Sequence, residues 1–207
     1  VDAGAGETIL SVARRHGVAI PQLCFKEGYR ADGNCRACVV EIDGERTLAP
    51  SCCRTATDGM QVHSASERAR KSQQMVVEML LSDMPDMGYR WNDEQKNTPE
   101  LIAGSAYPES ARGQFDSKTP ESTGQHGELS EWATRLGVAV RPALKALRRQ
   151  QPAPDLSHPA MAVNLDACIH CNRCVRACRE EQVNDVIGYA LRGAHSAIVF
   201  DLDDAMG

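Results

Sequence analysis

Aromatic residues are scarce in this sequence, at 4% of its 207 residues, although hydrophobic residues make up 42%. Any hydrophobic core must therefore be built mostly from aliphatic side chains and methionine. Positive charge is also in deficit, because the formal net charge is −5. Since nucleic-acid surfaces are normally basic, this balance argues against DNA or RNA as a partner. No stretch approaches the ~18 consecutive apolar residues of a membrane span, so none is expected.

Cysteine, in contrast, is abundant, and its nine residues form two groups. An odd number of thiols in tight clusters is a poor disulfide framework, because neighbouring cysteines cannot all reach partners. The first ten residues have neither a basic start nor a long apolar run, so no signal peptide is predicted. Clustered thiols without such a signal indicate metal or iron–sulfur ligation in a reducing compartment, and we expect a cytoplasmic protein. The groups are Cys24, Cys35, Cys38, Cys52 and Cys53, then Cys168, Cys171, Cys174 and Cys178.

The first cysteine group lies in a mixed α/β pattern. Residues 7–17 predict a short helix, residues 38–50 a hairpin with Asp43–Gly44 in a type I′ turn, and residues 60–64 a further strand. A helix beside a small sheet, with a long loop over residues 24–38, resembles a β-grasp ferredoxin.

The middle of the chain changes in composition. Ser64 and Glu67 form a capping box that predicts a helix ending at Pro85. Eight of the ten prolines then lie between Pro85 and Pro159, which indicates a long connector with one helix over residues 129–149. This connector packs on a larger domain or partner, or is a solvated linker.

The second cysteine group has the spacing Cys168-x2-Cys171-x2-Cys174-x3-Cys178, which matches the bacterial ferredoxin run. Cysteines at two-residue intervals let a curling loop place three thiolates on three irons of one [4Fe–4S] cube. Backbone N–H groups of the same loop can bond the cluster sulfurs and tune the potential. A four-cysteine zinc site, the alternative, usually uses two separated pairs.

The fourth cysteine of such a run ligates the other cluster in two-cluster ferredoxins. We therefore expect Cys168, Cys171 and Cys174 to hold one [4Fe–4S] cluster and Cys178 to hold a second. The matching half-motif would then lie beyond Gly207, and the alternative is one cluster held by all four thiols. Two residues between the ligands either tune the cluster or face solvent, and we favour the solvent-facing interpretation for both: His170 and Arg173.

The N-terminal spacing Cys24-x10-Cys35-x2-Cys38-x13-Cys52 differs from the plant-type spacing, whose first gap is x4. The stretch "PQLCFKEGYRADGNCRACVVEIDG", followed by "PSCCR", resembles the [2Fe–2S] domain of the complex I large iron–sulfur subunit. Relatives of that subunit include diaphorase subunits of NAD-linked hydrogenases and the N-terminal part of NAD-dependent formate dehydrogenases. The resemblance implies [2Fe–2S] ligation by these four cysteines. In the family the last ligand follows a serine, as Cys52 follows Ser51, which leaves Cys53 as a small buried residue. The family fold also begins with a strand that would precede Val1.

Among these relatives, "QPAPDLSHPAMAVNLDACIHCNRCVRACREEQVNDVIG" looks most like the alpha subunit of molybdenum- or tungsten-dependent, NAD-linked formate dehydrogenases. The resemblance covers residues 7–85 and 151–204. Complex I-type relatives also carry a [4Fe–4S] site with one histidine ligand after the second helix. Here Met84 stands where that histidine would be, and the cysteines are missing. We therefore expect this cluster to be absent, which counts against a standard complex I or hydrogenase subunit.

The predicted fold class is α+β in three parts. Residues 1–64 form a β-grasp [2Fe–2S] ferredoxin domain, residues 65–158 a helix and connector, and residues 159–207 half of a bacterial-type two-cluster [4Fe–4S] ferredoxin domain.

The resemblance implies an electron-transfer segment without catalytic residues of its own. Formate oxidation to carbon dioxide would occur at a Mo- or W-bis-pterin guanine dinucleotide in a catalytic domain C-terminal to it. Electrons would pass toward a diaphorase partner that binds FMN and NAD. The alternatives are an iron–sulfur subunit of complex I or of an NAD-linked hydrogenase and, in another class, a zinc-binding interaction module.

Overall fold

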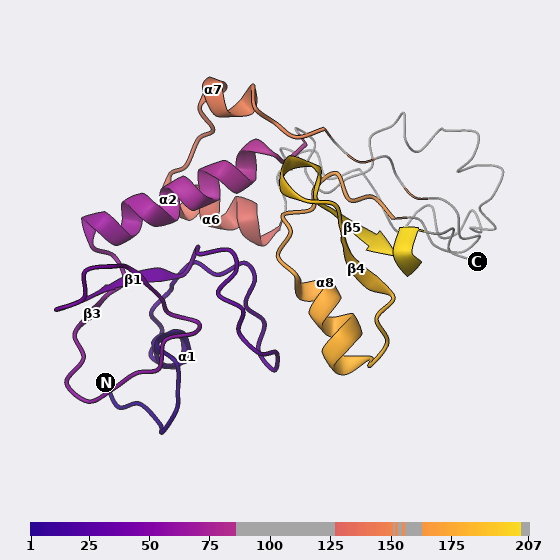
Figure 1. Cartoon of the computed structure of the whole chain (residues 1–207). Coiled ribbons are helices and arrows are strands. Elements are labelled where there is room, and N and C mark those ends of the chain that lie inside the picture. The colour runs from indigo at the N-terminus through magenta and orange to yellow at the C-terminus, as the bar shows by residue number, and fades with distance from the viewer. Residues whose placement is uncertain (86–126, 151, 153–154, 156–162, 204–207) are drawn as a thin grey trace, which may run out of the picture.

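The computed structural model describes residues 1–85, 127–150, 152, 155 and 163–203 of the chain. Figure 1 shows the N-terminal residues on one side of the molecule and the cysteine run of the C-terminal residues on the other. Two packed helices lie above and between these regions.

Helix α1 (Ile9–Arg15) confirms the helix expected over residues 7–17. Thr8 caps it, because its hydroxyl accepts a 3.3 Å hydrogen bond from the backbone N–H of Ser11. Gly17 follows the helix with a φ of 73°, the left-handed conformation that glycine adopts without strain at a helix end. The buried face of the helix consists of Ile9, Leu10 and Val12.

A three-stranded antiparallel sheet of order β2-β1-β3 follows. Strand β1 (Val39–Ile42) pairs through its first half with β2 (Ala49–Pro50) and through its second half with β3 (Val62–His63). Both strands expected beside β1 are therefore present.

The turn after β1 differs from the expected type I′. Glu45 N–H donates to Ile42 C=O over 3.0 Å, so residues 43 and 44 are the central residues of a tight turn. Only Gly44 has a positive φ, of 81°, whereas type I′ requires positive φ at both central positions. At this end β1 pairs with β3 and no longer with β2. The turn is therefore not constrained by a continuing β1–β2 ladder.

Helix α2 (Glu67–Ser82) confirms the second predicted helix but begins at a different cap. The hydroxyl of Ser66 accepts a 3.2 Å bond from Ala69 N–H, so the prediction of Ser64 as the cap was wrong. The carbonyl of Ser64 instead accepts from the Gln73 amide, which also donates to Val39 C=O. The helix is thereby attached to the sheet through a buried side chain.

The single helix expected over residues 129–149 is two helices. Helix α6 (Glu128–Leu136) ends at Gly137, which caps it in the left-handed conformation with a φ of 64°. Helix α7 (Pro142–Lys145) restarts with proline at its first position. Helix α6 packs along α2 (Figure 1), so this part of the connector packs within the chain rather than as a solvated linker. The expectation for residues 86–126 lies outside the described residues.

The C-terminal region is a loop, a short helix and a two-stranded sheet. Before the loop, Asp155 and Val163 form a single antiparallel bridge. Helix α8 carries Cys174, the π-helix η2 that follows it carries Cys178, and strands β4 and β5 form an antiparallel pair. The bounds are α8 Arg173–Arg176, the π-helix η2 Ala177–Glu181, β4 Ile187–Ala190, the 3-10 turn η3 Gly193–His195, β5 Ala197–Phe200 and the 3-10 turn η4 Asp201–Asp203.

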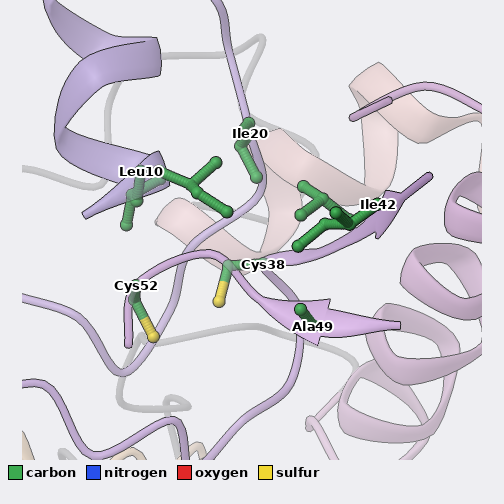
Figure 2. Packing of buried hydrophobic residues seen from close by; sticks show 8 residues of the cluster. Leu10, Ile20, Cys38, Ile42, Ala49 and Cys52 are labelled. Carbon is green, nitrogen blue, oxygen red and sulfur yellow. The ribbon is translucent and has the colours of Figure 1, made fainter. Parts of the chain in front are cut away.

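Two hydrophobic clusters organise these elements. The first, called here the sheet core, lies between α1 and the small sheet, and Figure 2 shows two cysteines within it. Its buried members are Ile9, Leu10, Ile20, Cys38, Val40, Ile42, Ala49 and Cys52.

The second cluster, called here the bridging core, joins all three parts of the chain. It takes two residues from the loop before β1, two from α2 and its end, two from α6 and one from the C-terminal cysteine loop. These are Leu23, Ala37, Val77, Met84, Leu129, Ala133 and Ala167. The two cysteine regions therefore pack on one shared apolar centre.

Among the helices that the structure describes, none is long and apolar enough to cross a membrane.

Candidate metal centres

The N-terminal cysteines converge from three separate segments. Cys24 lies in the loop after α1, Cys35 and Cys38 immediately precede β1, and Cys52 follows β2. Ser51 joins the last two segments, because its N–H and its hydroxyl donate to Cys38 C=O over 3.1 and 2.7 Å. Figure 2 shows the sulfur atoms of Cys38 and Cys52 directed to the same side.

The four thiols form two pairs. Cys35 N–H donates to Cys24 Sγ over 3.5 Å, and the two thiols also interact with each other. The hydrogen bond from the Cys24 thiol lowers the pKa of Cys35 to about 6 and raises that of Cys24. The Cys52 thiol likewise lowers the pKa of Cys38 to about 7, and its own pKa is raised. Each pair thus holds one readily formed thiolate, the species that binds metal.

This paired geometry suits two metal ions better than one. Within the described parts of the chain, no three His, Cys, Asp or Glu side chains gather around a single ion position. A [2Fe–2S] cluster with four cysteines binds two thiolates on each iron. The pairs Cys24–Cys35 and Cys38–Cys52 match that donor set, so the residues present fit the group that the family resemblance implies.

The adjacent thiols Cys52 and Cys53 have different surroundings. Cys52 is fully buried in the sheet core, whereas Cys53 is exposed, so the expectation of a buried Cys53 was wrong. Their sulfurs lie 3.6 Å apart, and Cys53 Sγ would be 3.0 Å from a Cβ added at Gly33. Cys53 therefore packs against the glycine of the loop, and Cys52 pairs with Cys38. Ligation by Cys52 itself stays a prediction.

Three C-terminal cysteines share one neighbourhood. Partial desolvation raises the pKa of both Cys168 and Cys174, and the charge of the neighbouring Cys171 raises both pKa values further. His170 N–H donates to Cys168 Sγ over 3.4 Å, the kind of bond that tunes a cluster. His170 and Asn172 have left-handed φ values of 53° and 64°, which curl the loop between the thiols. This donor set fits the predicted [4Fe–4S] site, where each thiolate takes a different iron.

Cys178 lies apart in a separate environment. It is buried, its Sγ contacts Asn184 Oδ1 at 2.6 Å, and Ile187 N–H donates to it over 3.3 Å. The structure therefore places this thiol against the start of β4. Its assignment to a second cluster stays a prediction.

His170 and Arg173 are both partly buried and make specific contacts, whereas the interpretation favoured from the sequence had them facing solvent. His170 Nε2 accepts from Arg149 over 2.8 Å, and its ring meets Tyr189 edge to face at 5.9 Å. Arg173 donates to Phe25 C=O over 2.8 Å and to Glu128 over 2.5 Å. Both residues hold the cysteine loop against neighbouring elements.

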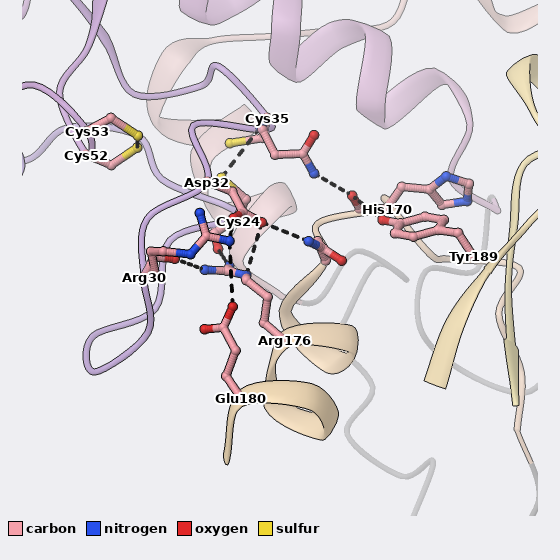
Figure 3. Close-up of polar contacts among 12 residues, drawn as sticks. Cys24, Arg30, Asp32, Cys35, Cys52, Cys53, His170, Arg176, Glu180 and Tyr189 are labelled. Carbon is pink, nitrogen blue, oxygen red and sulfur yellow. Dashed lines mark hydrogen bonds and ion pairs between the residues drawn. The ribbon is translucent and has the colours of Figure 1, made fainter. Parts of the chain in front are cut away.

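Sequence reasoning missed the polar bridge between the two cysteine regions (Figure 3). Asn34 donates to His170 C=O over 3.0 Å, and Asn172 donates to Asp32 over 2.8 Å. Arg176 is buried between them and binds the loop around Cys24. The available signal was the second arginine of the cysteine run, Arg176 in "CVRAC". A cation that is buried beside ligand cysteines requires a partner.

Comparisons with known proteins agree with the first of these centres. Residues 1–67 match the family model of the 2Fe-2S iron-sulfur cluster binding domain. The chain is 29% identical over 184 residues to the mitochondrial NADH-ubiquinone oxidoreductase 78 kDa subunit of Candida albicans, covering 89% of this chain and 21% of that protein. It is 23% identical over 203 residues to the putative formate dehydrogenase YrhE of Bacillus subtilis, covering 97% and 17%.

A solved structure shares the fold. The chain aligns with a chain of the NAD+-reducing [NiFe]-hydrogenase in the H2-reduced state, with a TM-score of 0.67 and 23% identity. The alignment covers 100% of this chain and 75% of the hydrogenase chain. The N-terminal region is thus a 2Fe–2S ferredoxin-like domain of mixed helix and small sheet. The chain spans only about a fifth of the length of these two curated relatives.

Proposed function

We propose that this chain is the iron–sulfur electron-transfer segment of a molybdenum- or tungsten-dependent, NAD-linked formate dehydrogenase. The observation that carries the proposal is one chain in which two cysteine sets pack on a single bridging core. Clusters at these sites accept and release single electrons. The chain's own residues hold them, bury them and bring them close.

Cys24, Cys35, Cys38 and Cys52 are proposed to hold the [2Fe–2S] cluster. The burial of three of these thiols excludes water from that site. Cys168, Cys171 and Cys174 are proposed to hold a [4Fe–4S] cluster in half of a two-cluster ferredoxin domain. Cys178 then reaches a second one, consistent with its separate surroundings beside Asn184.

Met84 supports the choice among the related enzymes. It is 7% exposed and packs with Val77 and Leu129 in the bridging core. An apolar thioether packed in a core is a poor replacement for a histidine ligand. The proposal therefore favours a formate dehydrogenase branch without the histidine-ligated cluster over complex I and hydrogenase subunits.

The remaining parts of the proposed enzyme lie outside this segment. A bis-pterin guanine dinucleotide site for Mo or W, in a domain C-terminal to it, would oxidise formate to carbon dioxide. A cytoplasmic diaphorase subunit with FMN and NAD would receive the electrons.

The test is anaerobic iron and acid-labile sulfide analysis of the full-length protein, with EPR after reduction by dithionite and, separately, by formate. We expect one [2Fe–2S] signal and at least two [4Fe–4S] signals, all of them developed by formate. Reduction by NADH or hydrogen but not by formate would assign the segment to complex I or a hydrogenase. Zinc in place of iron would overturn electron transfer altogether.

A further inference from the structure

A buried arginine connects the two cysteine regions. Arg176 lies in α8 between Cys174 and Cys178, and its side chain is 3% exposed. Its guanidinium donates to the backbone carbonyls of Cys24 and Arg30, both in the N-terminal loop. Figure 3 shows it reaching from the C-terminal helix into that loop.

Arg176 belongs to a group of neighbouring charges that alternate in sign. Arg176 Nε lies 3.2 Å from Asp32 Oδ2, and Asp32 is 14% exposed. Arg30 also approaches Asp32, at 3.4 Å, and approaches Glu180 at 3.7 Å, but its side chain is 73% exposed. Solvent screens Arg30 far more than Arg176. Arg176 is therefore the cation of this group whose field is best preserved at the Cys24 backbone.

We propose that Arg176 is a positioning residue that raises the reduction potential of the N-terminal cluster and makes it depend on docking of the C-terminal cysteine helix. This inference rests on the proposed function, because it needs a [2Fe–2S] cluster at Cys24. Reduction adds one electron and hence one negative charge to the cluster. A nearby buried cation stabilises that charge more strongly than a cation in water would. Hydrogen bonds and charges around the ligands are the usual means of tuning such potentials.

Because Asp32 carries the opposite charge, removing it should shift the reduction potential in the opposite direction to removing Arg176. Arg176→Met removes the cation while keeping an unbranched side chain of similar length. We expect the equilibrium constant for reduction of the [2Fe–2S] cluster to fall about tenfold, a decrease of ~59 mV for one electron. Asp32→Asn removes the anion and is expected to raise the potential. The double variant should return toward the wild-type value.

Arg179 provides the matched control on the same helical segment. Its side chain is 60% exposed, and its ion pair with Asp185, at 2.5 Å, lies within the C-terminal region. Arg179→Met removes the same charge and should leave the [2Fe–2S] potential unchanged. Arg176→Lys keeps the charge without the forked donor geometry, so it should retain most of the wild-type potential.

The measurement is an EPR-monitored redox titration of the full-length protein, after iron and sulfide analysis of each variant. Absence of a [2Fe–2S] cluster from the wild type would defeat the proposed function. A full cluster whose potential does not move in Arg176→Met would overturn only this inference. If the Arg176→Met variant does not assemble its [2Fe–2S] cluster, the Asp32→Asn variant still tests the proposal. A cluster potential that fails to rise in Asp32→Asn would contradict it. Shifts of the same sign in both single variants would indicate a purely structural role.

Discussion

The two cysteine regions of this chain are built in opposite ways. The N-terminal thiols come from three segments that the sheet and its loops bring together, and Cys24, Cys38 and Cys52 are buried. The first three C-terminal thiols come from one continuous loop and the start of a four-residue helix, and Cys174 is exposed. One site depends on long-range packing, and the other depends on local chain curvature.

The two regions also differ in what holds the thiols in position. The sheet core contains Cys38 and Cys52 among aliphatic side chains, so that half of the first site is positioned by packing. The C-terminal loop instead relies on strained backbone at His170 and Asn172. We expect the second site to depend more on its neighbours and on the bound cluster, because metal binding and folding are coupled where packing is sparse.

The largest expected effect separates the two adjacent thiols of the first region. Cys52→Ala removes the buried partner of Cys38, and the [2Fe–2S] EPR signal and its iron should be lost almost completely. Cys53→Ala removes only the exposed thiol and should retain both. The reverse result would assign ligation to Cys53 and would break the paired geometry described for the first region.

A second pair of variants tests whether the C-terminal run serves one cluster or two. Cys171→Ala should abolish the [4Fe–4S] signal of the loop, because Cys171 lies between the other two ligands. Cys178→Ala should leave that signal and remove a different one in the full-length protein. Low-temperature EPR distinguishes them, and loss of the same signal in both variants would place all four thiols on one cluster.

The bridging core is expected to stabilise both regions together. Leu129 is 0% exposed and packs in the cluster that includes Leu23 from the first region and Ala167 from the second. Leu129→Ala should lower the free energy of unfolding by ~2–5 kcal/mol in urea titrations, because it leaves a cavity. Leu147 is 77% exposed, and Leu147→Ala should cost less than ~0.5 kcal/mol. Equal losses would mean that the core does not join the regions.

The start of α2 gives a smaller and more local effect. Ser66→Ala removes the hydroxyl that accepts from Ala69 N–H and should cost ~1 kcal/mol of folding stability. Ser64→Ala is the control, since only the backbone carbonyl of Ser64 makes the contact with Gln73. A larger loss at Ser64 would restore the capping box predicted from the sequence.

The smallest effect concerns the ion pair that joins α7 to α2. Hydrogen bonds from the Arg141 side chain and backbone lower the pKa of Glu78 below its usual 4.5. A lowered carboxylate pKa contributes stability above the unfolded pKa, and this contribution is lost as pH falls through the folded pKa. Glu78→Gln should therefore destabilise the protein at pH 7, and the difference from wild type should shrink on acidification below about pH 4.5. Urea unfolding at both pH values measures it, and a pH-independent difference would exclude the ionic contribution.

Local signals in the sequence were reliable where the chain itself supplies the geometry. The helix predicted over residues 7–17 forms, and residues of the types that favour helix ends, Thr8 and Gly17, begin and end it. The helix expected over residues 129–149 failed because Gly137 adopts the left-handed conformation and ends it. Periodicity alone does not reveal such a break, since a single glycine inside a helical pattern is tolerated.

The sequence by itself determined which cysteines are grouped, because ligand spacing is a property of the chain. It also determined the [2Fe–2S] domain at the N-terminus, which the family comparison supports over residues 1–67. Only the tertiary structure decided that Cys52 is buried while Cys53 is exposed, and that Arg176 bridges the two regions. Burial and long-range hydrogen bonds depend on which distant segments pack together, and the spacing of residues along the chain does not specify that packing.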